Sequence, residues 1–145
     1  IAYMQAIAAS NSVSLHVRRG VYLNNAVHGG ICSADYYQKA IRFMEAQIDN
    51  PCFFVFSDDI SWCKEHLSIP QAIYVTGNNG TDSYNDMRLM SLCKHNIIAN
   101  SSFSWWGAWL NTYVDKVVIA PEKWFNIKNA TTKDLLPKAW VKISV

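Results

Sequence analysis

The stretch DYYQKAIRFMEAQIDNPCFFVFSDD, residues 35–59, decides the fold class. Its first half carries apolar residues at intervals of four, three and four, the spacing of one helix face: Tyr37, Ile41, Met44 and Ile48. Asn50-Pro51 ends this helix, expected over 35–48, because the residue before a proline avoids helical geometry. The run CFFVF at 52–56 is apolar throughout, as expected for a strand covered on both faces of a parallel sheet.

The alternation of helix and strand continues on both sides of this stretch. Upstream, VSLHV at 13–17 is a short β-prone run, and the sequence predicts further strands downstream: 72–75, 96–99, 116–120 and 140–145. Helices are expected before the later strands: a short one ending near Leu67, then 83–93 and 105–113. Strands separated by helices of about ten residues indicate βαβ units. We therefore predict an α/β fold with a parallel sheet and helices on both faces, formed by residues 1–145 as one domain.

Composition narrows the class of protein. The chain has 145 residues, half of them hydrophobic and 17% charged, which is typical of a globular domain with a real core. The net charge of +2 comes without a concentrated basic stripe, which argues against a nucleic-acid partner. No apolar run is long enough to span a bilayer. The chain starts without Met on IAYMQAIAAS, which reads as part of a helix, so we expect a fragment of a longer protein.

The four cysteines form no CxxC pair and have no zinc-finger spacing, so no metal site is expected: Cys32, Cys52, Cys63 and Cys93. They allow either two disulfides or four thiols. Cys52 and Cys93 fall in apolar runs that favour buried thiols and a reducing compartment. Three N-x-S/T triplets, at Asn79, Asn100 and Asn129, are too common by chance to decide anything.

Ligands of open α/β sheets bind at the carboxyl ends of the strands, which directs attention to the loops after 13–17, 52–56, 72–75 and 96–99. The first loop reads HVRRG. Arginine presents a planar fork of donors that matches phosphate, and Gly20 allows close approach of the backbone. Alternation places His16 and Arg18 on one face and Arg19 on the other, so Arg18 is predicted as the ligand and Arg19 as a structural brace. The alternative is a surface arginine pair in ordinary salt bridges.

The loop at 100–104, NSSFS, precedes a predicted helix. Backbone N–H groups at a helix N-terminus bind phosphate, and serine hydroxyls add donors. A plain serine N-cap is the alternative. Asp86, in the first turn of the preceding helix, has a carboxylate that can accept from the ring N–H and exocyclic amine of guanine. Its alternative is a capping box with Ser83.

Two further clusters have simpler interpretations. Asp58 and Asp59 follow the buried strand and suggest metal or general-base chemistry, but adjacent aspartates at a helix start are favoured as a cap. Trp105, Trp106 and Trp109 are a candidate sugar-stacking platform. For at least two of the three tryptophans we favour packing in the core.

Four sequence blocks together resemble glycosyltransferase family 11, the α-1,2-fucosyltransferases: HVRRG, FVFSDD, YNDMRLMSLCKHNIIANSSFSWWGAWLN and VIAPEKWF. Their order and spacing agree from about residue 13 to residue 125. The resemblance implies a GT-B enzyme, in which two Rossmann-like domains enclose the active site and the carboxyl-terminal one binds GDP-β-L-fucose. This chain would be that Rossmann-like half, and an amino-terminal acceptor domain is expected outside it.

The resemblance also implies roles for single residues. His16 would face guanine, Arg18 the β-phosphate, and Arg19 would support the loop. Asp86 would contact guanine, and the turn at Ser101, Ser102 and Phe103 would bind phosphate. The reaction would be inverting transfer to a galactose 2-hydroxyl of an oligosaccharide, without a metal or other cofactor, with Arg18 stabilising charge on the β-phosphate. His28 is a candidate base by residue type.

One departure bears on activity. The family pattern reads HxRRGDY, whereas Val21 stands at the Asp position here, which predicts weaker orientation of Arg19. A non-catalytic binding or structural module, inactive through Val21 and the missing acceptor domain, is therefore the alternative function. For localisation, the family resemblance suggests the bacterial cytoplasm, with peripheral association with the membrane as an option.

Overall fold

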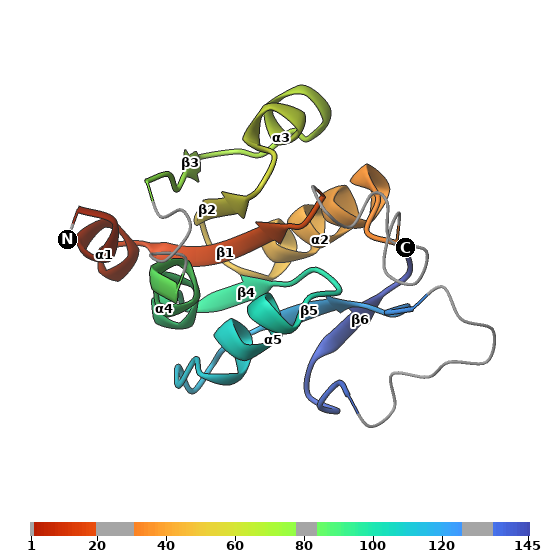
Figure 1. The fold of residues 1–145 in the computed structure, drawn as a ribbon. Helices are drawn as coiled ribbons and strands as arrows, with labels where there is room; N and C mark the ends of the chain where they lie inside the picture. Colours follow the sequence, from red (N-terminus) through yellow and green to blue (C-terminus); the bar gives the residue numbers. More distant parts are fainter. Residues whose placement is uncertain (1, 20–30, 78–83, 126–134) are drawn as a thin grey trace.

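The computed structural model describes residues 2–19, 31–77, 84–125 and 135–145 of the chain. Among these residues helices and strands alternate from α1 to β5, and β6 is the next described element, as Figure 1 shows. Their bounds are α1 Ala2–Ala8, β1 Asn11–Val17, α2 Ala34–Gln47, β2 Pro51–Ser57, α3 Ile60–His66, β3 Ala72–Tyr74, α4 Tyr84–Leu92, β4 His95–Ile97, α5 Ser102–Trp109, β5 Val118–Pro121 and β6 Val141–Ile143.

All six described strands are parallel and lie in the order β3-β2-β1-β4-β5-β6. The chain lays β2 and β3 on one side of β1 and then crosses to place β4, β5 and β6 on the other side. This is the strand order of a Rossmann fold. The predicted α/β class with a parallel, Rossmann-like sheet is confirmed.

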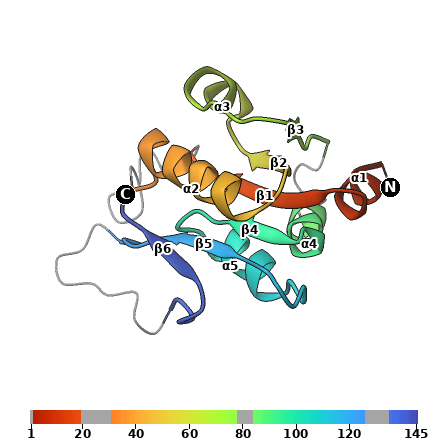
Figure 2. The ribbon, with the colours of Figure 1, turned by 180° about the vertical axis from the view of Figure 1, so that it is seen from behind.

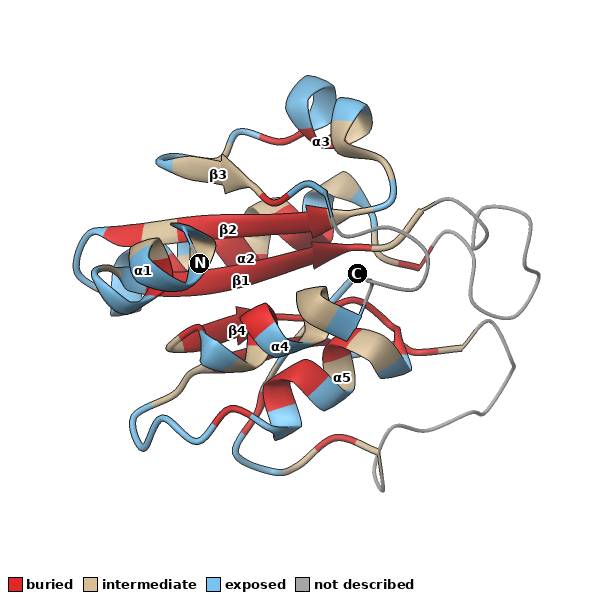
Figure 3. Cartoon of the chain, turned by 60° about the vertical axis from the view of Figure 1, so that its left-hand side comes forward, coloured by how far each residue is buried: buried red, intermediate tan, exposed pale blue. Residues whose placement is uncertain are grey.

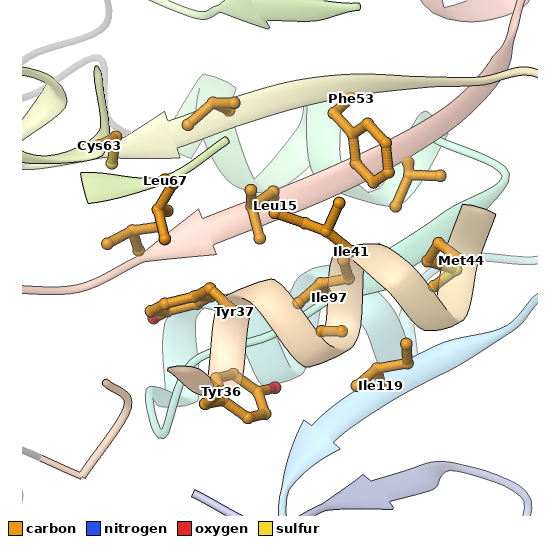
Figure 4. Close-up of a cluster of buried hydrophobic side chains, with 14 residues drawn as sticks. Leu15, Tyr36, Tyr37, Ile41, Met44, Phe53, Cys63, Leu67, Ile97 and Ile119 are labelled. Atoms are coloured by element: carbon orange, nitrogen blue, oxygen red, sulfur yellow. The ribbon is translucent and has the colours of Figure 1, made fainter. Parts of the chain in front are cut away.

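One face of the sheet is covered by α2 and α3 (Figure 2). Alternate residues of β1 point to this face, and Val13, Leu15 and Val17 are all fully buried there. The stripe of α2 that the spacing predicted packs onto them, and Figure 4 shows Tyr37 and Ile41 over the sheet. Both faces of β1 and β2 are covered, so nearly all residues of the two strands are buried (Figure 3).

The opposite face, under α1, α4 and α5, is apolar beside β2 and polar beside β1 and β4. Asn96 of β4 is fully buried, and its side-chain amide donates to the Ser14 hydroxyl at 2.7 Å and to the Met90 carbonyl at 2.9 Å. Its side-chain oxygen accepts from Asn111 at 2.8 Å. Each buried polar group named here therefore has a partner, which a core needs for stability.

Helices α4 and α5 approach each other closely at Gly107. A Cβ atom at this position would lie 2.9 Å from the Cβ of Met90, closer than real contacts allow. Only glycine therefore permits this helix spacing, which sets the position of α5 relative to the sheet.

The structure corrects two predicted boundaries. The helix expected over 105–113 begins at Ser102 and ends at Trp109, because the Trp105 N–H already bonds to the Ser101 carbonyl and Asn111 accepts from the Tyr113 N–H beyond the end. Pro51 is the first residue of β2 rather than a spacer before it, a strand position where no ladder donor is lost.

Two further predictions concern cysteines and membrane spans. All four cysteines are free thiols, with Cys63 and Cys93 buried and Cys32 and Cys52 partly exposed. Among the helices that the structure describes, none is long and apolar enough to cross a membrane.

Candidate active site

The strand order places a topological switch point between β1 and β4. The chain leaving β1 returns through α2 to β2 on one side, and the chain leaving β4 returns through α5 to β5 on the other. Ligands of open α/β sheets bind where these connections part, outside the carboxyl ends of the two strands. Residues 16–19 end β1 and follow it, and residues 100–104 follow β4, so the described parts of the two predicted phosphate loops flank the same point (Figure 1).

His16 and Phe103 join the two sides of the switch point. Their ring centroids are 5.8 Å apart, with the planes tilted by 46°. His16 is 6% exposed, and its Nδ1 is buried without a hydrogen-bond partner among the described residues. Burial, and after it the positive charge of Arg18, lowers the pKa of His16 from 6.5 to about 3. His16 is therefore a neutral imidazole near pH 7 and can both donate and accept.

The first turn of α5 offers free backbone donors. Ser101 lies before the helix in extended geometry and its side chain makes no capping bond. The hydroxyl of Ser104 instead accepts from the Ala99 N–H at 3.2 Å. Ser101 is therefore the N-cap of α5 by position, as the alternative considered from the sequence has it, but without a capping bond from its side chain. The N–H groups of residues 102–104 precede the first intrahelical bond, which starts at Trp105, and Ser102 is exposed.

Arg19 turns away from the switch point towards α3. Its backbone N–H donates to Asp58 at 2.8 Å, its Nε lies 3.7 Å from Asp59 Oδ2, and its guanidinium carbon is 4.0 Å from the centre of the Trp62 ring. These contacts fit the brace predicted for Arg19, whereas the ligand role of Arg18, half-buried two residues after His16, stays a prediction.

Asp58 and Asp59 are the two carboxylates that Arg19 contacts. Asp59 is also the N-cap of α3 and accepts from the Trp62 N–H at 3.1 Å, as the cap interpretation predicted. In the described ranges, no group of three or more His, Cys, Asp or Glu side chains is placed to hold a metal ion.

Asp86 is half-buried in the first turn of α4, at the same edge of the sheet as the switch point. One turn further along α4, Leu89 and Met90 pack with Phe103 in one cluster. This packing links the helix that carries Asp86 to the helix that follows the serine-rich turn. Gly20, Val21, His28 and Ser83 lie outside the described residues, so their predicted roles stay predictions.

The expected core position of the tryptophans is wrong for two of the three. Trp106 is 47% and Trp109 52% exposed, because they lie on the outer side of α5. Trp105 alone turns inward, where its indole N–H donates to the Leu135 carbonyl at 2.9 Å and its ring packs against Trp140. Trp109 stacks on Trp105 with ring centroids 5.3 Å apart.

Sequence reasoning missed three residues around the site. Trp62 reads as an ordinary helix residue and Tyr37 as an apolar one, yet Trp62 lies under Arg19 and the fully buried Tyr37 hydroxyl has a pKa raised by burial. Asn100 is 2% exposed, accepts from the Cys32 thiol at 3.5 Å and donates to the Trp124 carbonyl at 3.0 Å. Only the position of Asn100 at a strand end gave a signal.

Comparison with known proteins agrees with this geometry. The model of the family described as Glycosyl transferase family 11 matches residues 3–144. The O-antigen biosynthesis glycosyltransferase WbnK of Escherichia coli is 44% identical over 140 residues, which cover 92% of this chain and 45% of that protein. The alpha-1,2-colitosyltransferase of Escherichia coli is 44% identical over 143 residues, or 94% of this chain and 49% of that protein.

A more distant relative is named as a fucosyltransferase. Galactoside alpha-(1,2)-fucosyltransferase 2 of Rattus norvegicus is 31% identical over 106 residues, 70% of this chain and 30% of that protein. No solved structure matches the chain. The chain spans a little under half the length of the two Escherichia coli relatives. The match of the family model to residues 3–144 shows that the chain belongs to glycosyltransferase family 11.

Proposed function

We propose that this chain is the donor-binding part of an α-1,2-fucosyltransferase, which binds GDP-β-L-fucose and transfers fucose to the 2-hydroxyl of a galactose. The observation that carries the proposal is that the end of β1, which leads into Arg18, meets the first turn of α5 at the switch point through the contact of His16 with Phe103. One cation and one helix N-terminus on two sides of a point are what a diphosphate requires. The acceptor would be held by a second domain of a GT-B enzyme.

The nucleotide would lie across the carboxyl edge of β1 and β4. In this arrangement Arg18 binds the β-phosphate, and the N–H groups of residues 102–104, with the Ser101 and Ser102 hydroxyls, bind the phosphate oxygens. The neutral imidazole of His16 faces the guanine base. The Asp86 carboxylate accepts from the ring N–H and the exocyclic amine of guanine, a pattern of donors that adenine lacks.

The reaction would be a single in-line displacement. The oxygen of the acceptor hydroxyl forms a bond to the anomeric carbon of fucose while the bond from that carbon to the β-phosphate oxygen breaks. GDP leaves with the electron pair, the hydroxyl proton passes to a base, and the configuration inverts. Charge builds on the β-phosphate, where Arg18 and the α5 terminus stabilise it without a metal in this proposal. His28 is the proposed base by residue type.

Two alternatives follow from specific observations. The relative at 44% identity named for colitose makes that deoxy sugar a second candidate for the transferred group. A non-catalytic module that binds nucleotide without transfer is the other, because Val21 replaces the aspartate of the family pattern.

Calorimetric titration with GDP, and with ADP as the control, tests the proposal. We expect saturable binding of GDP and none of ADP at the same concentration. Transfer assays of the complete protein with GDP-fucose and GDP-colitose, on a galactose-terminated acceptor, then separate the alternatives. Binding without transfer would favour the non-catalytic module, and no binding of GDP would overturn the donor-site assignment.

A further inference from the structure

The turn that carries Arg18 is fastened to a different part of the fold, the junction of β2 and α3. The Ser57 hydroxyl donates to the Val17 carbonyl at 2.8 Å and accepts from the Asp59 N–H at 2.9 Å. The next link is the bond from the Arg19 N–H to Asp58, 2.8 Å long. These contacts hold the backbone on both sides of Arg18.

The Arg19 side chain adds two more links to the same junction. Its Nε lies 3.7 Å from Asp59 Oδ2, and its guanidinium carbon sits 4.0 Å from the centre of the Trp62 ring. Within α3, Trp62 also stacks on His66, with ring centroids 5.0 Å apart and ring planes at 17°. Arg19 is therefore held by the carboxylate that caps α3 and by an aromatic ring of α3.

We propose that Asp59 and Trp62 are positioning residues for the donor diphosphate, which act through Arg19 to fix the direction in which Arg18 leaves β1. The proposal rests on the proposed function, since it assigns how that site is held in shape. Neither residue needs to touch the nucleotide. Arg19 contributes through geometry, and its charge is balanced by Asp59 before any ligand arrives.

A stabilising role alone does not account for the arrangement. The side chains of Arg19 and Asp59 are 21% and 38% exposed, and ion pairs at such exposure contribute little to folding. Four contacts nevertheless restrict this short turn, two through its backbone and two through the Arg19 side chain. Preorganisation of a phosphate ligand is the property that such restriction improves.

A positioning role and simple electrostatics predict opposite changes in GDP affinity for one substitution, Asp59→Asn. Asp59→Asn keeps a side-chain oxygen that can cap α3, because asparagine caps as well as aspartate, but removes the charge that faces Arg19. Loss of a negative charge near an anion site should by itself strengthen the binding of GDP. We expect GDP to bind about three- to tenfold more weakly, because Arg19 and its turn are no longer fixed.

The experiment is GDP titration of the wild-type protein and four variants. Glu65→Gln, the same chemical change on the exposed side of α3, is the matched control and should retain wild-type affinity. Trp62→Ala should weaken GDP binding as Asp59→Asn does, and Trp62→Phe should restore most of the affinity because it keeps a ring face for Arg19. Far-ultraviolet circular dichroism of each variant checks that the fold is intact.

Two outcomes separate this inference from the function on which it rests. Wild-type binding of GDP with unchanged or higher affinity in Asp59→Asn would overturn the positioning role and leave the donor site in place. No binding of GDP by the wild-type protein would overturn the proposed function and the positioning role together.

Discussion

His16, at the end of β1, and Phe103, in the first turn of α5, place their ring centroids 5.8 Å apart across the switch point of the sheet. Phe103 also packs with Leu89 and Met90 of α4. One aromatic ring thus connects the buried imidazole of β1, the helix that follows β4 and the helix that carries Asp86. The Phe103 ring therefore fixes the positions of β1, α4 and α5 relative to one another.

Replacement of Phe103 by leucine should weaken GDP binding by about three- to fivefold, because the apolar volume is kept but the ring contact with His16 is lost. Calorimetric titration of the variant measures the change. Phe43→Leu, in the half-buried α2 position on the other face of the sheet, is the control and should bind GDP as the wild type does. Equal affinity of both variants would show that His16 needs no support from α5.

Replacement of Arg18 by alanine should reduce GDP affinity by about ten- to a hundredfold, because a charged hydrogen bond to the phosphate is lost. Arg18→Lys keeps the charge without the planar fork of donors, so its GDP affinity should lie between those of the wild type and Arg18→Ala. The binding of guanosine, which has no phosphate, should not change. Arg42→Ala removes an exposed arginine of α2 and serves as the control. A matching loss for guanosine would place Arg18 at the base instead.

The lowered pKa of His16 predicts acid sensitivity of the fold. Above pH 6.5 the imidazole is neutral in both the folded and unfolded chain, so it adds no pH dependence there. Below pH 6.5 the unfolded chain takes up a proton that folded His16, with a pKa of about 3, does not. The free energy of unfolding should therefore fall by about 2 kcal/mol from this residue between pH 7.5 and pH 5.

Urea unfolding of wild-type protein and His16→Gln at the two pH values measures this contribution. The variant should lose less stability than the wild type on going to pH 5. The same slope in both proteins would mean that His16 is accessible to protons in the folded state. His95, whose pKa is also lowered by burial, adds a slope of the same sign to both proteins.

Gly107→Ala tests the close approach of α4 and α5. Helix propensity alone predicts stabilisation by about 1 kcal/mol, since alanine is the better helix former. The added Cβ, 2.9 Å from the Cβ of Met90, instead predicts destabilisation by about 1–3 kcal/mol. Urea unfolding decides between the two signs. Increased stability would show that the helices can separate without cost.

The sheet could be predicted because the local pattern carries most of its information. The run at 52–56 is apolar throughout because β2 is covered on both faces, and the stripe of α2 follows the period of one helix. The order of the strands has no such local signal. β4 is only three residues long and contains His95 and Asn96, whose burial depends on partners such as Ser14 and the Val117 N–H.

From the sequence, candidate site residues could be placed in the fold mainly where they follow strands directly. Arg18 and the serine-rich turn follow strands directly, so the rule for parallel sheets located them. Trp62 could not be found in this way, because its role depends on a contact between α3 and a residue that follows β1. The early start of α5 was not predictable either, because the Ser104 hydroxyl bonds back to the Ala99 N–H instead of facing solvent.

The position of β4 beside β1 has a consequence for folding. Val13 pairs with His95 and Leu15 with Ile97, so the two walls of the switch point come from segments distant in the chain and meet only when this pair forms. A partly folded molecule with β1, α2 and β2 in place would have one wall and no site. A ligand held by both walls would therefore bind only molecules whose central strand pair has closed, and would raise the unfolding midpoint in proportion to the logarithm of its concentration.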